Sequence, residues 1–245
     1  MGHYYTKSGE PCHFQPDGKD TTLRHARKQD LVPSVTGILD VASNPGLSRY
    51  FENQLLESAW GTYAGTGAEY TEWCKEVRQS AGEHSKQARE AGIYGHNVLD
   101  KYYSGEPVFE SDEVLAREVS QTINNHFGLD QGDFETEKTF ATEYYGGAVD
   151  LSCREVVIDF KIKSEEWGKK KNGEPKKIWF DNHVAQLAAY RQGLGYPTAT
   201  LANVFISPTA EVYIKEWTPE EAAQGEEYFR ACLKLWNCKN KLFGG

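Results

Sequence analysis

Two neighbouring stretches decide the fold of this chain: GGAVDL at residues 146–151 and VVIDFKIK at residues 156–163. Side chains alternate between the two faces of a strand, so the apolar residues of the second stretch share one face, and Asp159 and Lys161 share the other. Two residues of strand rise about 6.6 Å, which leaves these two polar side chains next to each other. The short connection between the stretches predicts an antiparallel hairpin.

The register of this hairpin decides where its acidic residues lie. We expect the turn to be centred between Cys153 and Arg154. Val157 then lies opposite Asp150, and Asp159 is the diagonal neighbour of Asp150 on the same face, about 7–8 Å away at the Cα atoms. A turn centred one residue away is expected to send Asp150 into the core.

Asp150, Asp159 and Lys161 together suggest a specific chemistry. Two carboxylates this close need a cation between them, or one of them must bind a proton. An all-oxygen pair favours a hard divalent ion such as Mg²⁺ or Mn²⁺, beside which Lys161 can hold an attacking water or neutralise charge on phosphate oxygens. The pattern is typical of metal-assisted phosphodiester hydrolysis. The alternative is a salt-bridged hairpin in a protein that does not bind nucleic acid.

The elements around the hairpin define the fold class. Three consecutive strands with short connections predict an antiparallel meander at residues 134–142, 145–152 and 156–163. A helix, two further strands and a last helix are predicted at residues 183–194, 200–207, 211–217 and from Thr218 onward. This order of elements predicts an α/β fold.

The N-terminal half is expected to be mostly helical. Residues 1–33 look irregular, and helical patterns follow at residues 34–41, 47–60, 69–103 and 112–127, with a break near Gly82. We divide the chain into an irregular and helical extension at residues 1–85 and a core at residues 86–245. No change in composition forces a second domain, so the two parts are expected to form one compact structural unit.

Charge is distributed unevenly along the chain. The 245 residues carry a net charge of −9, which argues against a protein that coats polyanions with its whole surface. Residues 161–177, in contrast, carry a local net charge of +4, and the loop at residues 164–181 places its lysines among Trp167, Trp179 and Phe180. That composition suits a loop that holds phosphates and stacks bases, although a solvated loop without a ligand has the same composition.

Cysteine usage and hydropathy indicate the compartment. The five cysteines form no CxxC pair, so neither a disulfide framework nor a zinc ribbon is indicated, and a reducing cytoplasm is the expected location. The N-terminus has no apolar core of a signal peptide, and glycines and prolines interrupt the charge-free stretch at residues 192–210. We therefore expect no association with a membrane.

Four pieces of the sequence resemble one nuclease family. GGAVDL and VVIDFKIK resemble motifs II and III of the PD-(D/E)XK nuclease superfamily, in its RecB-like exonuclease branch. AGIYGHNVLDKYYSG at residues 91–105 resembles the helix of that branch with the GxxxH pattern, and QLAAY at residues 186–190 resembles its QxxxY motif. The opening segment at residues 21–39 is similar to that of phage-type and mitochondrial genome maintenance exonucleases.

The resemblance implies a fold and an activity. The fold is a restriction-endonuclease-like core, in which an antiparallel meander is followed by a helix and further strands, with a helical N-terminal extension that guides DNA. The activity is a Mg²⁺- or Mn²⁺-dependent exonuclease that hydrolyses phosphodiester bonds from the free ends of single- or double-stranded DNA, in phage or bacterial replication, recombination or degradation. A monomer or small homo-oligomer is expected. No iron–sulfur cluster is expected, because only Cys232 and Cys238 lie near the C-terminus.

The resemblance also implies roles for single residues. The catalytic residues would be His96, Asp150, Asp159 and Lys161, and the metal ligands would be His96, Asp150, Asp159 and the carbonyl of Phe160. The residues expected to contact DNA are Lys163, Trp167, Lys169, Lys170, Lys171, Gln186, Tyr190, Arg24 and Arg27. Gln186 and Tyr190 could instead brace Lys161. Two plainer alternatives remain: His96 paired with Asp100 in the core, and Tyr190 packed on the sheet.

Two other functions fit the same motifs. A structure-specific or sequence-specific endonuclease would use the same core and would cut covalently closed circular DNA, which an exonuclease leaves intact. A catalytically silent DNA-binding protein that assists recombination would keep the fold and bind DNA without cutting it. The presence of all four polar positions argues against such a loss of activity.

Overall fold

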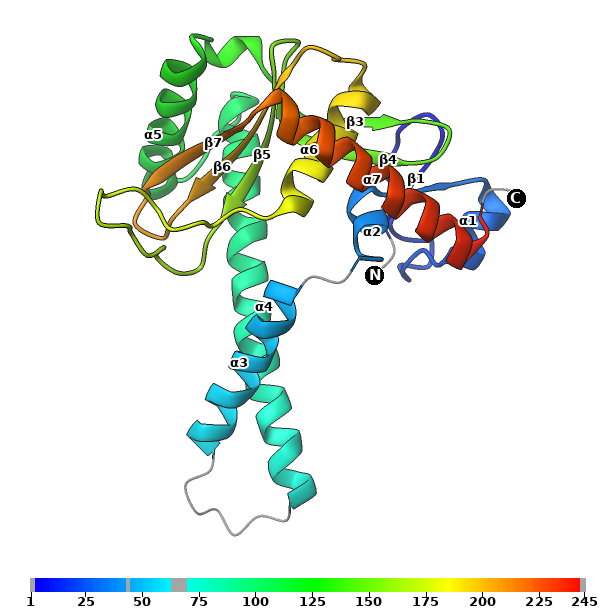
Figure 1. Ribbon diagram of the computed structural model, residues 1–245, viewed down its shortest axis with the longest axis vertical. Helices are drawn as coiled ribbons and strands as arrows, with labels where there is room; N and C mark the ends of the chain where they lie inside the picture. The colour runs from blue at the N-terminus through cyan, green and yellow to red at the C-terminus, as the bar shows by residue number, and fades with distance from the viewer. Residues whose placement is uncertain (1–2, 43–44, 63–69, 243–245) are drawn as a thin grey trace. The chain divides into compact units, whose positions relative to one another are not determined.

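The computed structural model describes residues 3–42, 45–62 and 70–242 (Figure 1). The chain forms two compact units, which we call the sheet unit (residues 1–42 and 96–245) and the helical unit (residues 43–95). Residues 3–42 group with the sheet unit in this division, and the sequence-based boundary between residues 85 and 86 stays a prediction.

A mixed five-stranded sheet forms the centre of the sheet unit, in the order β3-β4-β5-β6-β7. The first three strands form the predicted antiparallel meander, β6 runs parallel to β5, and β7 is antiparallel to β6. The predicted α/β fold is therefore confirmed. The strands are β3 (Glu135–Ala141), β4 (Gly146–Ser152), β5 (Val156–Ile162), β6 (Thr200–Ile206) and β7 (Val212–Trp217).

Helix α6 (Asp181–Leu194) connects the two parallel strands. Two parallel neighbours need such a crossover, because a tight turn reverses the chain direction. The parallel register places Asp159 of β5 next to Asn203 of β6. The β5-α6-β6 unit therefore brings residues that are more than forty positions apart to the same place on the sheet.

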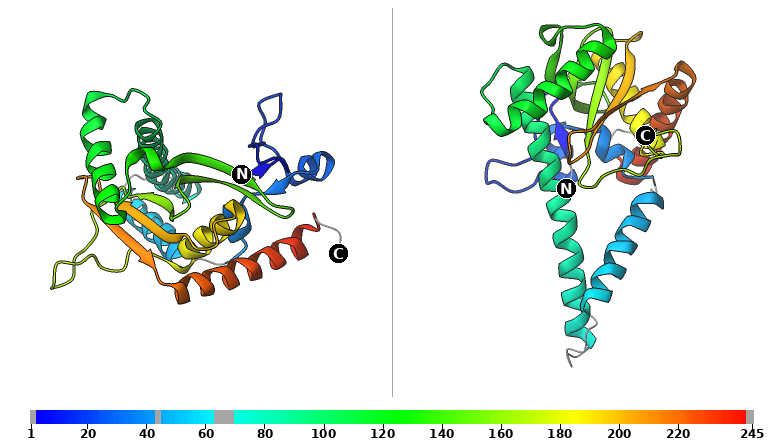
Figure 2. Two further views of the ribbon diagram at one scale, coloured as in Figure 1. Left: turned by 90° about the horizontal axis from the view of Figure 1, so that it is seen from above. Right: turned by 90° about the vertical axis from the view of Figure 1, so that its left-hand side faces the viewer.

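Helices cover both faces of the sheet (Figure 2). Val157 packs with α2 (Val35–Leu39), α6 and α7 (Pro219–Asn240), whereas Ile158 and Phe160 pack with the C-terminal part of α4 (Tyr70–Tyr103) and with α5 (Glu110–Phe127). The face that carries Asp159 is therefore buried as well, and this carboxylate is only 3% exposed. A polar residue in the alternation of β5 does not mark a solvated face here.

The β4–β5 hairpin has a different register from the expected one. Leu151 pairs with Ile158, which centres the turn one residue further along the chain. Continued along the strands, this register places Asp150 directly opposite Asp159 rather than diagonal to it. The expectation that such a move would send Asp150 into the core is wrong, because moving the centre by one residue shifts the pairing by two, and side chains alternate with period two.

The helix boundaries follow capping residues in the sequence. Ser34 caps α2, with its Oγ accepting a hydrogen bond from the backbone N–H of Gly37 at 3.0 Å, and Thr218 caps α7. The predicted break near Gly82 is wrong, since α4 continues through it. One glycine inside a helix costs only about 1 kcal/mol, which the rest of a long helix can offset.

Residues 3–33 contain more regular structure than expected. They contain β1 (Tyr4–Tyr5), α1 (Leu23–Gln29) and β2 (Val32–Pro33), with β1 and β2 paired as a small antiparallel sheet. Tyr5 packs directly on β4, and a Cβ added at Gly146 would lie 2.8 Å from the Tyr5 Cβ. Glycine is thus required at residue 146 for this segment to reach the sheet.

The helical unit contains α3 (Pro45–Thr62) and the part of α4 that ends at Gly95. Among the side chains of this unit that the structure describes, Ser58, Val77 and Ala81 are buried, whereas Leu56 and Trp60 are exposed. No helix in the described ranges of the chain is long and apolar enough to cross a membrane.

Candidate functional site

Strands β4 and β5 separate at Asp150. Counted from the turn, Leu151 and Ile158 are the last paired residues of the two strands. The Asp150 carboxylate then accepts a hydrogen bond from the backbone N–H of Phe160 through Oδ2 at 2.7 Å. The regular alternation of side chains in β4 is also interrupted here. Residues two apart normally share a face, but Val149 packs against α6 whereas Leu151 packs against α4 and α5. Asp150 is therefore held inside the sheet, where side chains from both layers can reach it.

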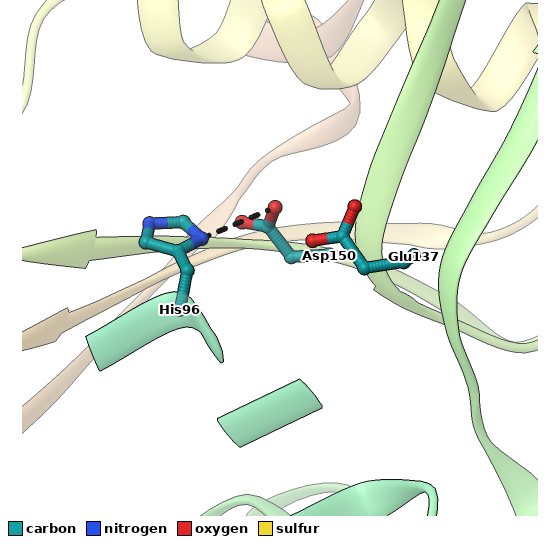
Figure 3. Close-up of side chains that lie close together, drawn as sticks. All are labelled: His96, Glu137 and Asp150. Carbon is teal, nitrogen blue, oxygen red and sulfur yellow. Dashed lines mark ion pairs between the residues drawn. The ribbon is translucent and has the colours of Figure 1, made fainter. Parts of the chain in front are cut away.

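His96 of α4 approaches Asp150 from one of these layers (Figure 3). Its Nδ1 lies 3.4 Å from Asp150 Oδ1. The alternative partner, Asp100, accepts instead from the Thr136 hydroxyl at 2.7 Å. Of the two positions proposed for this imidazole from the sequence, the structure has the one beside Asp150.

Glu137 is a third member of the site that the sequence analysis missed. It lies in β3, in the position that faces Asp150 when the β3–β4 register is continued, and Figure 3 shows its carboxylate beside that of Asp150. Its backbone has φ 45°, a left-handed conformation that is unfavourable for a residue with a side chain. Such strain is retained where the surrounding structure fixes the residue, and functional sites are where it is most often found.

The electrostatics of this cluster follow from three ionisable groups in one place. Glu137 is exposed as a residue, yet partial burial of its carboxyl group, together with the charges of Asp150 and Asp100, raises its pKa to about 7. Burial lowers the pKa of His96, but the hydrogen bond and charge of Asp150 outweigh burial and the net pKa is raised. The cluster therefore favours bound protons or a bound cation.

The donor set of the cluster fits a divalent metal ion. One ligand atom each from His96, Glu137 and Asp150 lies within 4.8 Å of the others. An imidazole nitrogen with two carboxylate oxygens is a ligand set that Mn²⁺ accepts readily and that Mg²⁺ can use together with waters. A cation there would also relieve the repulsion between the two carboxylates.

Asp159 lies next to this cluster but is bound differently. Its Oδ2 lies 2.7 Å from the Lys161 ammonium, its Oδ1 accepts from Gln186 Nε2 at 2.7 Å, and Asn203 Nδ2 donates to Oδ2 at 2.7 Å. Asp159 does not belong to the group of three ligand atoms that lie close together in the described part of the chain. The predicted pair of Asp159 and Lys161 is present, and hydrogen-bond donors surround the Asp159 carboxylate.

The contacts of Asp159 favour its ionised form. Burial raises the pKa of this carboxyl group, the charge of Lys161 lowers it and the charge of Asp150 raises it, so that the net pKa lies above its usual value in the absence of a cation. Its side-chain contacts with Lys161, Gln186 and Asn203 all supply donors, so a proton on the carboxyl group would have no acceptor among them. Charge-assisted hydrogen bonds of this kind compensate a buried carboxylate.

The sequence left two roles open for Gln186 and Tyr190: they could hold Lys161 in place, or they could contact DNA. Gln186 accepts from the Lys161 ammonium at 3.3 Å and donates to the Tyr190 hydroxyl at 2.9 Å. Tyr190 is 5% exposed and packs edge-on against Phe140. In this arrangement Gln186 holds Lys161 in place. Tyr190 packs on the sheet, which is the plainer of the two alternatives given for it.

The Lys-rich loop is less available than its composition suggests. Trp167 is buried, so its ring is not an exposed surface for stacking a base. Lys169 pairs with Glu211 at 2.9 Å and Lys170 pairs with Glu174 at 3.3 Å, whereas Lys171 is exposed. Part of the local positive charge is therefore neutralised within the protein.

Lys163 differs from these lysines. It lies two residues after Lys161 at the end of β5, and its ammonium lies 5.2 Å from the centre of the Phe205 ring. Burial lowers the pKa of Lys163, followed by the charge of Lys161. Within the described residues, no carboxylate oxygen lies within 4 Å of its ammonium.

Arg24 and Arg27, the two arginines expected to contact DNA, lie on α1. Arg24 is exposed, and Arg27 donates to the backbone carbonyl of Asn240 at the end of α7. The Arg27 guanidinium therefore connects α1 to the C-terminal helix. The expected contact of these arginines with DNA stays a prediction.

His183, at the start of α6, is a further buried titratable group that the sequence did not single out. Its Nδ1 accepts from the backbone N–H of Phe180 at 3.4 Å, and its ring lies 5.9 Å from that of Phe205. Burial, and then the charges of Lys161 and Lys163, lower its pKa to about 3. It is therefore neutral at neutral pH.

The low pKa of His183 predicts a specific loss of stability in acid. Between about pH 6.5, where the unfolded histidine titrates, and pH 3, the unfolded chain binds more protons, so the free energy of unfolding falls as the pH falls. From pH 7 to pH 5 this linkage amounts to about 2 kcal/mol. In urea titrations at both pH values, wild type should lose about 2 kcal/mol more than His183→Asn. Equal losses in the two proteins would contradict the prediction.

Comparisons with known proteins leave the family open. No family model and no curated protein sequence matches the chain. Among solved structures, it is similar to a candidate exonuclease from Eubacterium rectale, with 12% identity and a TM-score of 0.43, over 62% of this chain and 69% of that chain. A likeness at this level carries no argument about activity, so the chemistry rests on the residues of the site.

Proposed function

We propose that this protein is a divalent-metal-dependent deoxyribonuclease of the RecB-like PD-(D/E)XK type, which releases nucleotides from DNA ends in phage or bacterial DNA metabolism. The observation that carries the proposal is the proximity of two groups at the point where the β4–β5 pairing ends. One group is the ligand cluster of His96, Glu137 and Asp150, and the other is the Asp159–Lys161 pair. A cation site beside a half-buried lysine is what hydrolysis of a phosphodiester needs.

Each residue has a proposed role. His96, Glu137 and Asp150 would hold the metal, with one lone pair of Asp159 Oδ1 and the Phe160 carbonyl as further ligands. A metal bound there would supply Lewis acidity toward a phosphoryl oxygen and lower the pKa of a bound water. The Lys161 ammonium would stabilise charge that develops on the phosphorus oxygens, and Gln186 would keep it in place.

Cleavage of defined DNA tests the proposal. End-labelled single- and double-stranded oligonucleotides, blocked in turn at each end, should lose mononucleotides or short products in the presence of Mg²⁺ or Mn²⁺ and not in EDTA. Covalently closed circular DNA should stay intact. Cutting of the circle would establish the endonuclease alternative, and binding without any cleavage would establish the silent accessory protein.

We expect Lys163 to contact a backbone phosphate next to the scissile one. Its half-buried ammonium has no carboxylate partner in the described part of the chain, and a buried charge is stabilised by an anion. Lys163→Met keeps the packing on Phe205 but removes the charge. The slope of log Kd against log salt for single-stranded DNA, measured in EDTA, should become shallower by about 0.7, the value for one phosphate.

Lys169→Met is the matched control for this measurement. Lys169 belongs to the same basic stretch but already pairs with Glu211, so its removal should change the salt slope less. If both variants change the slope by the same amount, or neither does, Lys163 has no special place in DNA binding.

A further inference from the structure

Asn203 is a buried polar residue in the middle of an apolar strand. It lies in β6 next to Asp159 of β5, and it has no exposed surface. A buried amide must satisfy its donors and its acceptor within the protein, since an unpaired polar group in the core costs about 1–3 kcal/mol. Its partners therefore decide its orientation.

Trp217 fixes the orientation of this amide. The indole Nε1 of Trp217 donates to Asn203 Oδ1 at 2.8 Å. Because an indole N–H can only donate, the amide oxygen must face it and the amide nitrogen must face the other way. That nitrogen donates to Asp159 Oδ2 at 2.7 Å and lies 3.4 Å from the Asp159 backbone carbonyl oxygen.

The Asp159 carboxylate thus has one neutral and one charged donor on the same oxygen. Asn203 and Lys161 both contact Oδ2, whereas Gln186 contacts Oδ1. Each carboxylate oxygen has about two lone-pair positions. Oδ2 is filled, and a metal ion can reach Asp159 only through the remaining position on Oδ1 or by replacing Lys161 on Oδ2.

A metal ion that binds Asp159 through Oδ2 has to displace Lys161, because Asn203 fills the other position on that oxygen. Asp159, which is only 3% exposed, would then lose its contact with the ammonium. Removing one member of a buried ion pair is costly unless another group compensates the remaining charge. The amide of Asn203 is the donor on the same oxygen that can stay when the lysine leaves.

We propose that Asn203, oriented by Trp217, is a positioning residue that holds the Asp159 carboxylate when Lys161 leaves it, and so permits Asp159 to bind the metal. This inference rests on the proposed function. It distinguishes two states of the protein. Without metal, Lys161 compensates Asp159 and Asn203 matters little. With metal bound to Asp159, Asn203 is needed.

The test compares metal binding in variants of the full chain. Asn203→Leu has a similar shape and removes both hydrogen bonds, and Trp217→Phe leaves the amide but frees it to rotate. Mn²⁺ binding, measured by calorimetry in the absence of DNA, should be about 10–100-fold weaker in Asn203→Leu, as for removal of a group that orients a metal ligand. The Mg²⁺ concentration for half-maximal cleavage should rise by a similar factor. Trp217→Phe should give a smaller change of the same sign.

Two controls separate this role from a purely structural one. Ser152→Ala removes another fully buried polar group of the sheet, one whose Oγ has no hydrogen-bond partner among the described residues, and should leave the Mn²⁺ affinity unchanged. The double variant Asn203→Leu/Trp217→Phe should bind Mn²⁺ no more weakly than Asn203→Leu, because both act through the same amide. Trp217→Phe keeps the test valid if Asn203→Leu does not fold.

The outcomes are distinguishable. If wild type neither binds Mn²⁺ nor cleaves DNA, the proposed function fails and the inference falls with it. If wild type does both and the Asn203 and Trp217 variants keep its Mn²⁺ affinity, the function stands and the inference is overturned. Weaker Mn²⁺ binding in these variants, with unchanged binding in Ser152→Ala, supports it.

Discussion

Asp150→Asn should lower Mg²⁺-dependent release of nucleotides by about 10³-fold, the scale of losing a group that stabilises transition-state charge. The fold should survive, because an amide oxygen can still accept the hydrogen bond of the Phe160 N–H and the amide nitrogen can face His96. What disappears is the negative charge at the centre of the ligand cluster. The measurement is the initial rate of product release from an end-labelled oligonucleotide at saturating Mg²⁺.

Glu155→Gln is the matched control for this variant. Glu155 lies at the exposed turn of the same hairpin and is not part of the ligand cluster, so its neutralisation should leave the rate within about twofold of wild type. Circular dichroism and the melting temperature in EDTA would verify that both variants fold. More than a tenth of wild-type activity in Asp150→Asn would contradict the assignment of this residue.

Mn²⁺ should stabilise the folded protein through the same cluster. At a concentration 100 times its dissociation constant, a ligand that binds only the folded state adds about 2.7 kcal/mol to the free energy of unfolding, or about 5–10 °C in melting temperature for a domain of this size. Glu137→Gln removes one of the three ligands. If its affinity falls about 100-fold, the same Mn²⁺ concentration adds only about 0.4 kcal/mol, or about 1 °C.

Glu135→Gln is the control for Glu137→Gln. Both residues lie on β3, but Glu135 pairs with Lys138 and lies outside the cluster. Its thermal shift with Mn²⁺, measured by differential scanning fluorimetry against EDTA, should equal that of wild type. A full shift in Glu137→Gln would remove this residue from the ligand set, and no shift in wild type would remove the metal site itself.

Much of the sheet unit could be predicted because its signals are local. The alternation in β5, and the capping residues Ser34 and Thr218, predict strands and helix starts that the structure confirms. The hairpin register was wrong because apolar alternation fixes which face a residue is on but not its partner, and a shift by two residues satisfies the same pattern. The sequence could not predict that a helical layer buries the polar face.

The site could be predicted only in part. His96, Asp150, Asp159 and Lys161 were singled out, and the structure brings His96 to Asp150 and Lys161 to Asp159. Glu137 was missed because it joins them through the β3–β4 register. A hairpin turn placed between Glu143 and Tyr144 would have set it opposite Asp150.

Asn203 was missed for a different reason. It lies in the run TLANVFI, which reads as an apolar core strand, and its pairing with Asp159 exists only after α6 has brought β6 beside β5. A single amide inside such a run was the available signal, because a buried amide needs partners of its own.

The three-residue ligand cluster and the lysine come from separate segments of the chain. His96, Glu137 and Asp150 are supplied by α4 and the β3–β4 hairpin, whereas Asp159, Lys161, Gln186 and Asn203 all belong to β5-α6-β6. In evolution, the two groups can therefore diverge independently. A descendant that lost the three side chains of the cluster would still inherit the second group intact, and with it a well-folded scaffold that natural selection could recruit for a role without catalysis.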